Sequence, residues 1–113
     1  MSTIFNKIIS KEINADIIYE DDTVLAFKDI NPQAPVHILI IPKIEIATIN
    51  DISINDKDLI GHIFIVATKL AKKLNIDKSG YRLVFNCNED GGQTVYHIHM
   101  HLIGGRKLTW PLG

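Results

Sequence analysis

The sequence is poor in cysteine and tryptophan, with one of each among its 113 residues, and it has no long apolar stretch. Because Cys87 is alone, neither an internal disulfide nor a cysteine-based zinc site can form, which fits a reducing compartment. The longest apolar run, residues 38–42, is far shorter than the roughly 20 residues of a membrane-spanning helix. Charged residues stand near the N-terminus where a signal peptide would be apolar. We therefore expect a cytoplasmic protein with no membrane partner.

An excess of charge is also missing, because 12 basic residues face 13 acidic ones and the net charge is −1. No run of lysine and arginine exceeds two residues, so we expect no nucleic-acid partner. A small anionic ligand stays possible, since it needs only local groups. A chain of this length can bury roughly two-thirds of its unfolded surface, which predicts one folded domain over residues 1–113.

The hydrophobic pattern predicts five strands and one long helix. Apolar spacing favours a short helix within residues 5–13 and a long helix over residues 55–74, with Asn55 as its cap. The long helix would be buried along one stripe, formed by Leu59, Ile63, Val66, Leu70 and Leu74. The strands are expected at residues 17–19, 23–28, 36–41, 81–87 and 96–103. Hairpin-length connections then give an α+β domain with a mostly antiparallel sheet.

Three of the five histidines lie at alternate positions, His97, His99 and His101. On a strand this spacing places the three imidazoles on one face and sends Ile98 and Met100 toward the core. Because protonated imidazoles repel one another, such a cluster needs a purpose. Three interpretations are open: a polar sheet face, a zinc site, and a phosphate site in which one histidine is the nucleophile.

The loop before the histidines favours the phosphate interpretation. Residues 91–94 read Gly-Gly-Gln-Thr and offer backbone N–H groups, an amide and a hydroxyl, which are groups that bind phosphate oxygens. A metal site usually shows a carboxylate or cysteine and further acids that orient the ligands, and this segment lacks both. We therefore expect no metal and no other cofactor.

Several motifs together resemble the histidine triad superfamily. His-Ile-His-Met-His-Leu-Ile at residues 97–103 matches its His-φ-His-φ-His-φ-φ signature, in which φ is apolar. Residues 27–37 and 90–97, with the closing Gly-Gly-Arg and Trp-Pro-Leu-Gly, look like the Hint branch, the nucleoside phosphoramidases. Gly-Gly-Arg differs from the Pro-Arg pair typical of the Fhit-like branch, and the chain has no room for the DNA-binding modules of the aprataxin-like branch. The resemblance runs from Ile4 to the last residue and implies a HIT-like fold, with a five-stranded antiparallel sheet, a short N-terminal helix and a homodimer joined edge to edge.

The resemblance also implies catalytic roles. His99 would attack the α-phosphorus and form a nucleotidyl-histidine intermediate, while the His97 carbonyl keeps the other ring nitrogen of His99 protonated. His101 would bind the phosphoryl oxygens, and His37 would be the fourth histidine of the site. Thr94, where serine is commoner, would contact the phosphate or the leaving amine. The implied reaction is the hydrolysis of purine nucleoside 5′-phosphoramidates, AMP-linked amines in particular.

Nucleotide contacts are implied for a further set of residues. Asp29 would take both ribose hydroxyls, and Trp110 would lie on the leaving-group side. The remaining contacts, apolar in the purine slot and polar near the phosphate, are Phe5, Ile8, Phe27, Ile30, Asn86, Gly92, Gln93, Thr94, His99 and His101. Each has a plain structural alternative, such as core packing for the apolar residues, a turn for Asp29, or Trp110 folded back on its own domain.

Two other functions stay open at this point. The chain could be a nucleotide-binding or regulatory module with little or no turnover, or a zinc-binding protein that uses the histidine cluster. Covalent nucleotidylation of the protein would separate the enzyme from the binding module.

Overall fold

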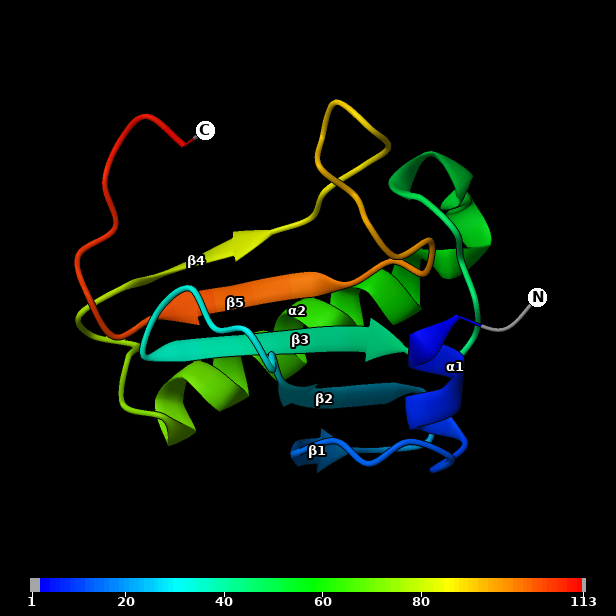
Figure 1. Cartoon of the computed structure of the whole chain (residues 1–113), viewed down its shortest axis with the longest axis horizontal. Coiled ribbons are helices and arrows are strands. Elements are labelled where there is room, and N and C mark those ends of the chain that lie inside the picture. Colours follow the sequence, from blue (N-terminus) through cyan, green and yellow to red (C-terminus); the bar gives the residue numbers. More distant parts are fainter. Residues whose placement is uncertain (1–2, 113) are drawn as a thin grey trace.

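A computed structural model describes residues 3–112 as two helices, five strands and two short 3-10 turns. In chain order these are α1 (Ile4–Ile9), β1 (Ile17–Glu20), β2 (Val24–Lys28), β3 (Val36–Pro42), η1 (Ile49–Asp51), η2 (Ile54–Asp56), α2 (Lys57–Lys73), β4 (Tyr81–Val84) and β5 (Met100–Gly104). The strands form one sheet of order β1-β2-β3-β5-β4, and every neighbouring pair is antiparallel (Figure 1). The predicted α+β class, the five-stranded antiparallel sheet and the short N-terminal helix are confirmed. No helix within residues 3–112 has the length and apolar character to cross a membrane.

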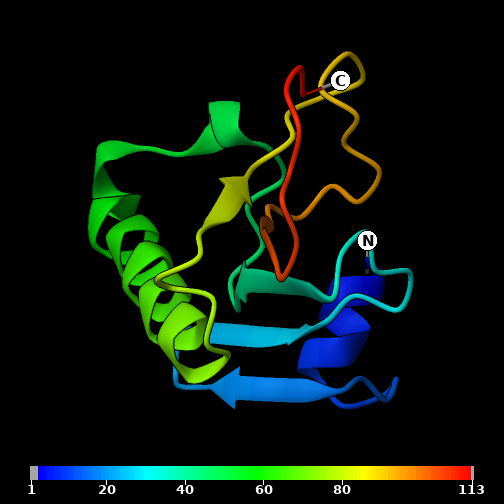
Figure 2. The same ribbon diagram turned by 90° about the vertical axis from the view of Figure 1, so that its left-hand side faces the viewer.

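The two helices lie on opposite sides of the sheet, which gives the molecule two apolar cores (Figure 2). Under α2, Ile63, Val66 and Leu70 of the predicted stripe are buried, while Leu59 and Leu74 are partly buried at its ends. The second core lies under α1 and consists of Phe5, Ile8, Leu25, Phe27, Leu39 and Ile41. Alternation along the strands therefore sends each neighbouring side chain to a different core, and the functional residues share the α1 face.

Two features of the long helix differ from the prediction. The helix begins at Lys57, and Asn55 does not cap it, because Asn55 lies inside the preceding turn η2. Ser53 caps that turn instead, with a reciprocal bond in which Asp56 accepts from the Ser53 backbone N–H. The prediction missed this arrangement because two consecutive 3-10 turns precede the helix, and each of them has its own capping residue.

Both of the last strands are shorter than predicted. β4 ends at Val84 instead of Cys87, and β5 begins at Met100 instead of Tyr96. The β3–β5 ladder stops at Ile40 opposite Met100. Two residues farther along, Pro42 has no amide hydrogen to donate, so the ladder cannot continue past it. His97 and His99 therefore precede the strand instead of lying within it.

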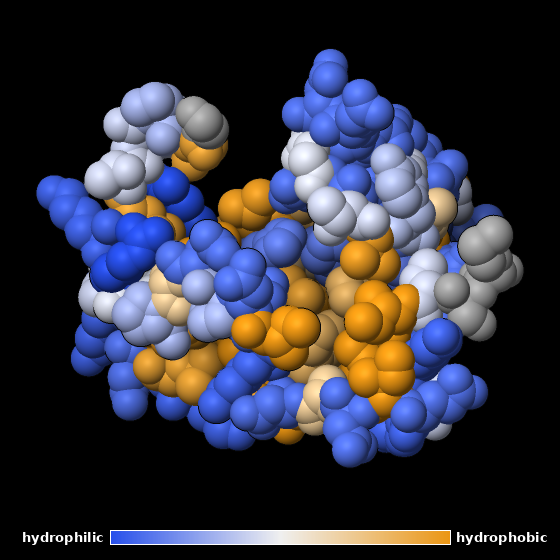
Figure 3. Space-filling model, in the orientation of Figure 1, coloured by the Kyte–Doolittle hydropathy of each residue, from blue (hydrophilic) through white to orange (hydrophobic). Residues whose placement is uncertain are grey.

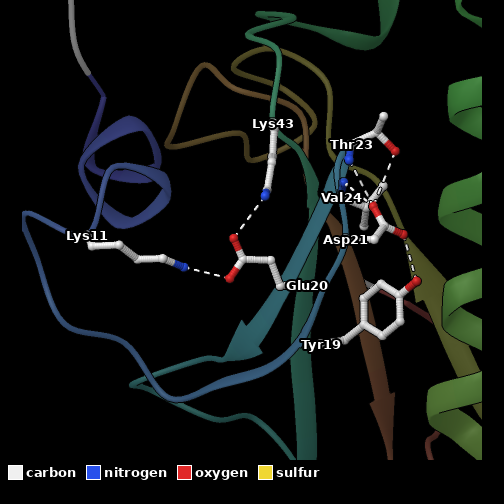
Figure 4. A network of polar contacts seen from close by, with 7 residues as sticks. All are labelled: Lys11, Tyr19, Glu20, Asp21, Thr23, Val24 and Lys43. Carbon is white, nitrogen blue, oxygen red and sulfur yellow. Dashed lines mark hydrogen bonds and ion pairs between the residues drawn. The ribbon is translucent and has the colours of Figure 1, made fainter.

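The β1–β2 turn is held by two adjacent carboxylates (Figure 4). Glu20 pairs with Lys11 at 2.6 Å and Lys43 at 2.8 Å, which joins the segment after α1 to the end of β3. Asp21 accepts from the backbone N–H groups of Thr23 and Val24 through Oδ1, and from side chains through Oδ2. The side-chain donors are the Tyr19 hydroxyl and His62 of α2, each at 2.6 Å from Oδ2.

These bonds set the pKa of Asp21. Burial alone would raise the pKa of this carboxyl, but hydrogen bonds from Tyr19, His62 and the turn amides hold it well below its usual range. Asp21 thus ties the hairpin to the helix, and it does so only as a carboxylate.

We expect the substitution Asp21→Ala to lower the free energy of unfolding by about 2 kcal/mol, because several donors lose a charged acceptor. In the wild type, the contribution of Asp21 is present above the unfolded carboxyl pKa of about 4 and is lost as pH falls through the lower folded pKa. Urea titration from pH 7 to pH 2 measures both effects. An Asp22→Ala control changes the neighbouring carboxylate, and an equal loss in both variants would contradict the assignment.

Candidate active site

Four imidazoles gather on the α1 face of the sheet. His101 of β5 lies between two other histidines, with ring centroids 5.0 Å from His99 and 5.2 Å from His37 of β3. Phe5 of α1 packs edge-on against His99 at 5.0 Å and His97 at 5.8 Å. His97, His99 and His37 are at most 7% exposed. The predicted cluster therefore assembles, although two of its members precede the strand.

Backbone carbonyls fix the protonation of the first two rings. The Nε2–H of His97 donates at 2.7 Å to the carbonyl of Pro42, the residue past which the β3–β5 ladder cannot continue. The Nδ1–H of His99 donates to the His97 carbonyl at 2.9 Å. Because a carbonyl can only accept, the neutral His99 ring keeps its lone pair on Nε2. This is the arrangement that a histidine nucleophile requires.

A backbone amide fixes the other two rings. The N–H of Gln33 donates to Nδ1 of His37 at 3.1 Å, so the hydrogen of the neutral His37 ring is on Nε2. That Nε2 lies 2.9 Å from Nδ1 of His101 and must donate to it. His101 then carries its own hydrogen on Nε2. The result is a chain of donors, from Gln33 through His37 to His101, that ends in an N–H group able to bind an anion.

Burial keeps all four rings neutral near pH 7. It lowers the pKa values of His37, His97 and His99 below the ordinary value. Burial, together with the neighbouring His99 and His37 rings, lowers the pKa of His101 to about 4. The lone pair on Nε2 of His99 and the Nε2–H group of His101 are therefore both available at neutral pH without a proton being removed first.

A pocket of about 410 Å³ opens beside the histidines, between α1, β2 and the loop before β5. Its lining includes eight of the predicted residues: Phe5, Ile8, Phe27, Asp29, Ile30, Thr94, His99 and His101. Figure 3 shows an apolar surface near α1 beside this hollowed region. Ile30 is 96% exposed and forms a lip, whereas the other predicted apolar residues are buried. The prediction missed seven further lining residues, of which only Leu39 had a signal, by alternation with His37. The seven are Ile4, Ile13, Asn14, Ala15, Lys28, Leu39 and Val95.

The Asp29 carboxylate stabilises a turn and can still accept hydrogen bonds from a ligand. Its Oδ1 accepts from the Asn31 N–H at 2.8 Å, which is the turn role that the sequence also allowed. Its Oδ2 lies 3.5 Å from Nε2 of His37. The carboxylate lines the pocket, and each oxygen can accept a further bond.

Six predicted residues do not line this pocket: His37 and His97, whose bonds are described above, and Asn86, Gly92, Gln93 and Trp110. The side chain of Gln93 is buried and bonds to Asn88, Ala47 and Val95, so it holds the loop together instead of facing a ligand. The N–H groups of Gly92 and Gln93 also donate within the loop. Asn86 lines a second pocket, and its Oδ1 is buried without a partner within residues 3–112. Trp110 is 79% exposed, and its one described contact is with its own domain, where the Arg82 guanidinium lies 5.9 Å from the ring centroid.

A metal would fit poorly among these groups. Within residues 3–112, atoms of Asp29, His37 and His101 come within 4.8 Å of one another, close enough for one ion. Ligation through Nε2 of His37 would require its hydrogen on Nδ1, which already accepts from the Gln33 N–H. The donor set present therefore conflicts with the tautomer that a metal needs.

The fold and the site together define a class. A five-stranded antiparallel sheet that presents three alternating histidines at the start of its β5 strand is the arrangement of a histidine triad protein. The family model described as "HIT domain" matches residues 10–108, and the chain belongs to this family.

Named relatives agree with this assignment. A purine nucleoside phosphoramidase of Escherichia coli (strain K12) is 58% identical over 94% of this chain and 89% of its own length. A HIT family hydrolase from Legionella pneumophila has a crystal structure that superimposes with a TM-score of 0.98 at 55% identity, covering 99% of this chain and 100% of that one. A histidine triad protein from Clostridium difficile gives a TM-score of 0.93 at 46% identity, over 96% of this chain and 95% of that one.

Acid should destabilise the protein through these rings. Each folded pKa lies below the unfolded histidine pKa of about 6.5, so the unfolded chain binds protons first as pH falls. The stabilising contribution is complete above pH 6.5 and is lost on the way down to the folded pKa, about 4 for His101. The free energy of unfolding of the wild type should fall over this pH range, and we expect the fall to be roughly 2 kcal/mol smaller in the His101→Gln variant.

Chemical denaturation at several pH values measures this loss, and NMR titration of the His101 ring tests the pKa directly. A His101 ring that titrates near pH 6.5 would contradict the proposed neutral state.

Proposed function

We propose that this protein hydrolyses purine nucleoside 5′-phosphoramidates, AMP-linked amines in particular, to the nucleoside monophosphate and the free amine. The observation that carries the proposal is the His99 ring, whose Nδ1–H is held by the His97 carbonyl, so that a neutral Nε2 lone pair is left in a pocket with an apolar slot. The E. coli relative named purine nucleoside phosphoramidase supports the choice of substrate.

The first step forms a covalent intermediate. Nε2 of His99 attacks the α-phosphorus, an Nε2–P bond forms, and the P–N bond to the amine breaks. The leaving nitrogen takes the bonding pair and one proton, and we assign the Thr94 hydroxyl in the pocket lining as the donor of that proton. Nε2–H of His101 stabilises the charge on the phosphoryl oxygens.

The second step returns the enzyme to its starting state. Water attacks the same phosphorus, the Nε2–P bond breaks, and the lone pair returns to His99. The proton released by the water replaces the one that left with the amine, so atoms and charge balance over the cycle.

Binding of the nucleotide uses the other end of the pocket. The purine would lie between Phe5, Ile8 and Phe27, with Ile30 as the exposed lip. The Asp29 carboxylate would accept from the ribose hydroxyls, since both of its oxygens have acceptor capacity left.

We also propose a homodimer, joined at the β4 edge of the sheet. β4 has only one neighbour, so the backbone groups of its outer side have no partner strand within residues 3–112. Apolar side chains collect near this edge: Phe64 of α2 is 43% exposed and lies 6.3 Å from the Phe85 ring, which directly follows β4. Trp110 and Leu112 of the tail are also exposed, and a partner's site would give them a surface to cover.

A cytoplasmic location and a single domain over residues 1–113 remain predictions.

We expect His99→Ala to abolish turnover while AMP still binds, because the nucleophile is lost but the base and ribose contacts are not. The measurements are kcat/KM for an AMP–amine conjugate and the affinity for AMP. In the wild type, rapid quenching and mass spectrometry should detect a nucleotidyl adduct on His99.

Two outcomes would contradict this mechanism. The first is a His99→Ala variant whose kcat/KM stays within a few-fold of wild type. The second is activity that EDTA removes and zinc restores, since the proposed route needs no metal. A variant that loses AMP binding as well would indicate misfolding, which circular dichroism detects.

We expect sedimentation equilibrium to give twice the chain mass of 12.7 kDa. Phe64→Asp should shift the mass toward the monomer, because it places a charge in the proposed interface. Ile44→Asp is the matched control, since Ile44 is 56% exposed and follows β3 away from β4. A monomeric wild type, or dissociation by both variants, would be inconsistent with a dimer at the β4 edge.

A further inference from the structure

The backbone donor that fixes the His37 and His101 rings lies in an exposed loop. Gln33 is an exposed residue of the segment between β2 and β3, outside the ladder that joins these two strands. Its side-chain amide donates within the same segment, to the Asn31 carbonyl at 3.0 Å. An N–H group in such a loop turns toward water unless the chain around it is held. The hydrogen pattern of both rings therefore depends on what holds Gln33.

Arg106, which follows β5, holds Gln33 from the other side. Nη2 of Arg106 donates to the Gln33 carbonyl at 2.9 Å, and Nη1 donates to the Lys107 carbonyl at 3.3 Å. Within residues 3–112 Arg106 forms no ion pair with an acidic side chain. A hydrogen bond from a charged donor is stronger than one between neutral groups. Gln33 is thus fixed at both of its backbone polar groups, at the N–H by His37 and at the carbonyl by Arg106.

The chain after β5 approaches this loop closely. Gly105 has a φ of +91°, a conformation that L side chains rarely adopt. A Cβ atom on Gly105 would lie only 2.9 Å from Cβ of Pro35, near the end of the loop. The backbone after β5 therefore lies directly against the segment that precedes β3 (Figure 1). This approach brings Arg106, the next residue, within reach of a carbonyl 73 positions away in sequence.

Release of Gln33 would permit the opposite hydrogen pattern in the two rings. Without the Gln33 N–H, Nδ1 of His37 can carry the hydrogen, and Nε2 of His37 then becomes an acceptor. Because that Nε2 lies 2.9 Å from Nδ1 of His101, the hydrogen of His101 would move to Nδ1. Nε2 of His101 would then present a lone pair to the phosphoryl oxygens instead of an N–H group. A lone pair repels these oxygens, so the reversed pattern removes one stabilising bond from the transition state.

We propose that Arg106 is a positioning residue for the proposed reaction, because it holds Gln33 in place to donate to His37. Its effect reaches His101 through this chain of bonds, and the role requires no contact between Arg106 and the reacting atoms. The effect on rate rests on the proposed phosphoramidase function, whereas the hydrogen pattern is a property of the resting protein.

The first test measures the hydrogen pattern itself. Arg106→Met keeps an apolar stem and loses the donors, whereas Arg106→Lys keeps a charged donor; Arg106 is exposed, so both variants leave the two cores intact. NMR of the isotope-labelled imidazole nitrogens shows which nitrogen of each ring carries the hydrogen. We expect Nε2–H on His37 and His101 in the wild type, a shift of His101 toward the Nδ1–H form in Arg106→Met, and recovery in Arg106→Lys. The His99 ring is the internal reference, since the His97 carbonyl fixes it independently.

The second test measures the rate with adenosine 5′-phosphoramidate, whose leaving group is ammonia, so that contacts to a larger amine do not contribute. We expect kcat to fall about tenfold in Arg106→Met, less than for loss of a whole donor, because the Nε2–H form of His101 stays partly populated. KM and inhibition by AMP should stay within about threefold of wild type, since the nucleotide contacts are unchanged. Arg106→Lys should restore most of the rate.

Lys107→Met is the matched control, because it removes the neighbouring cation and leaves the bond between Arg106 and Gln33 in place. It should change neither the imidazole spectrum nor kcat. Retention of Nε2–H on both rings in Arg106→Met would overturn the proposal whatever the rate, and so would an equal effect of the Lys107 variant. If the wild type does not hydrolyse the phosphoramidate, the proposed function fails, and the spectra still decide whether Arg106 sets the hydrogen pattern.

Discussion

The site depends on three backbone groups that decide which nitrogen of each imidazole carries a hydrogen. The Pro42 and His97 carbonyls can only accept, and the Gln33 amide can only donate. An imidazole in water exchanges its two neutral forms freely, whereas these rings each have one. Because main-chain atoms belong to the sheet and its loops, the protonation pattern is as rigid as the fold. The lone pair of His99 and the N–H of His101 follow from it.

Pro42 is the point at which fold and site meet. Its missing amide hydrogen ends the β3–β5 ladder, and its carbonyl is thereby free to receive the His97 ring. If the ladder continued, His99 would be a strand residue, and the backbone carbonyls beside it would accept hydrogen bonds from neighbouring strands. The interruption instead lets the His97 carbonyl turn toward His99 Nδ1. One proline therefore shortens a strand and helps to orient the His99 ring.

The sequence predicted the residues of the site better than their local structure. Alternation of His97, His99 and His101 with apolar residues was sufficient to find the cluster, because the pattern is local and its chemistry is distinctive. The lengths of the last two strands were wrong, since the effect of Pro42 on β5 depends on a pairing across more than fifty residues of chain. Gln93 was assigned to the ligand, but its bonds to Ala47 and Val95 could not be read from its neighbours in sequence.

The neutrality of the imidazoles has a consequence for the end of the catalytic cycle. A nucleoside phosphoramidate carries one negative charge, while a monophosphate with a second pKa near 6 carries almost two at neutral pH. In the proposed reaction, rings with depressed pKa values would bind phosphoryl oxygens by hydrogen bonds alone. They would offer no positive charge to balance the second negative charge of the monophosphate. The Asp29 carboxylate, 3.5 Å from His37, repels it further. In the proposed reaction the enzyme would thus hold its substrate at least as readily as its product, which favours product release.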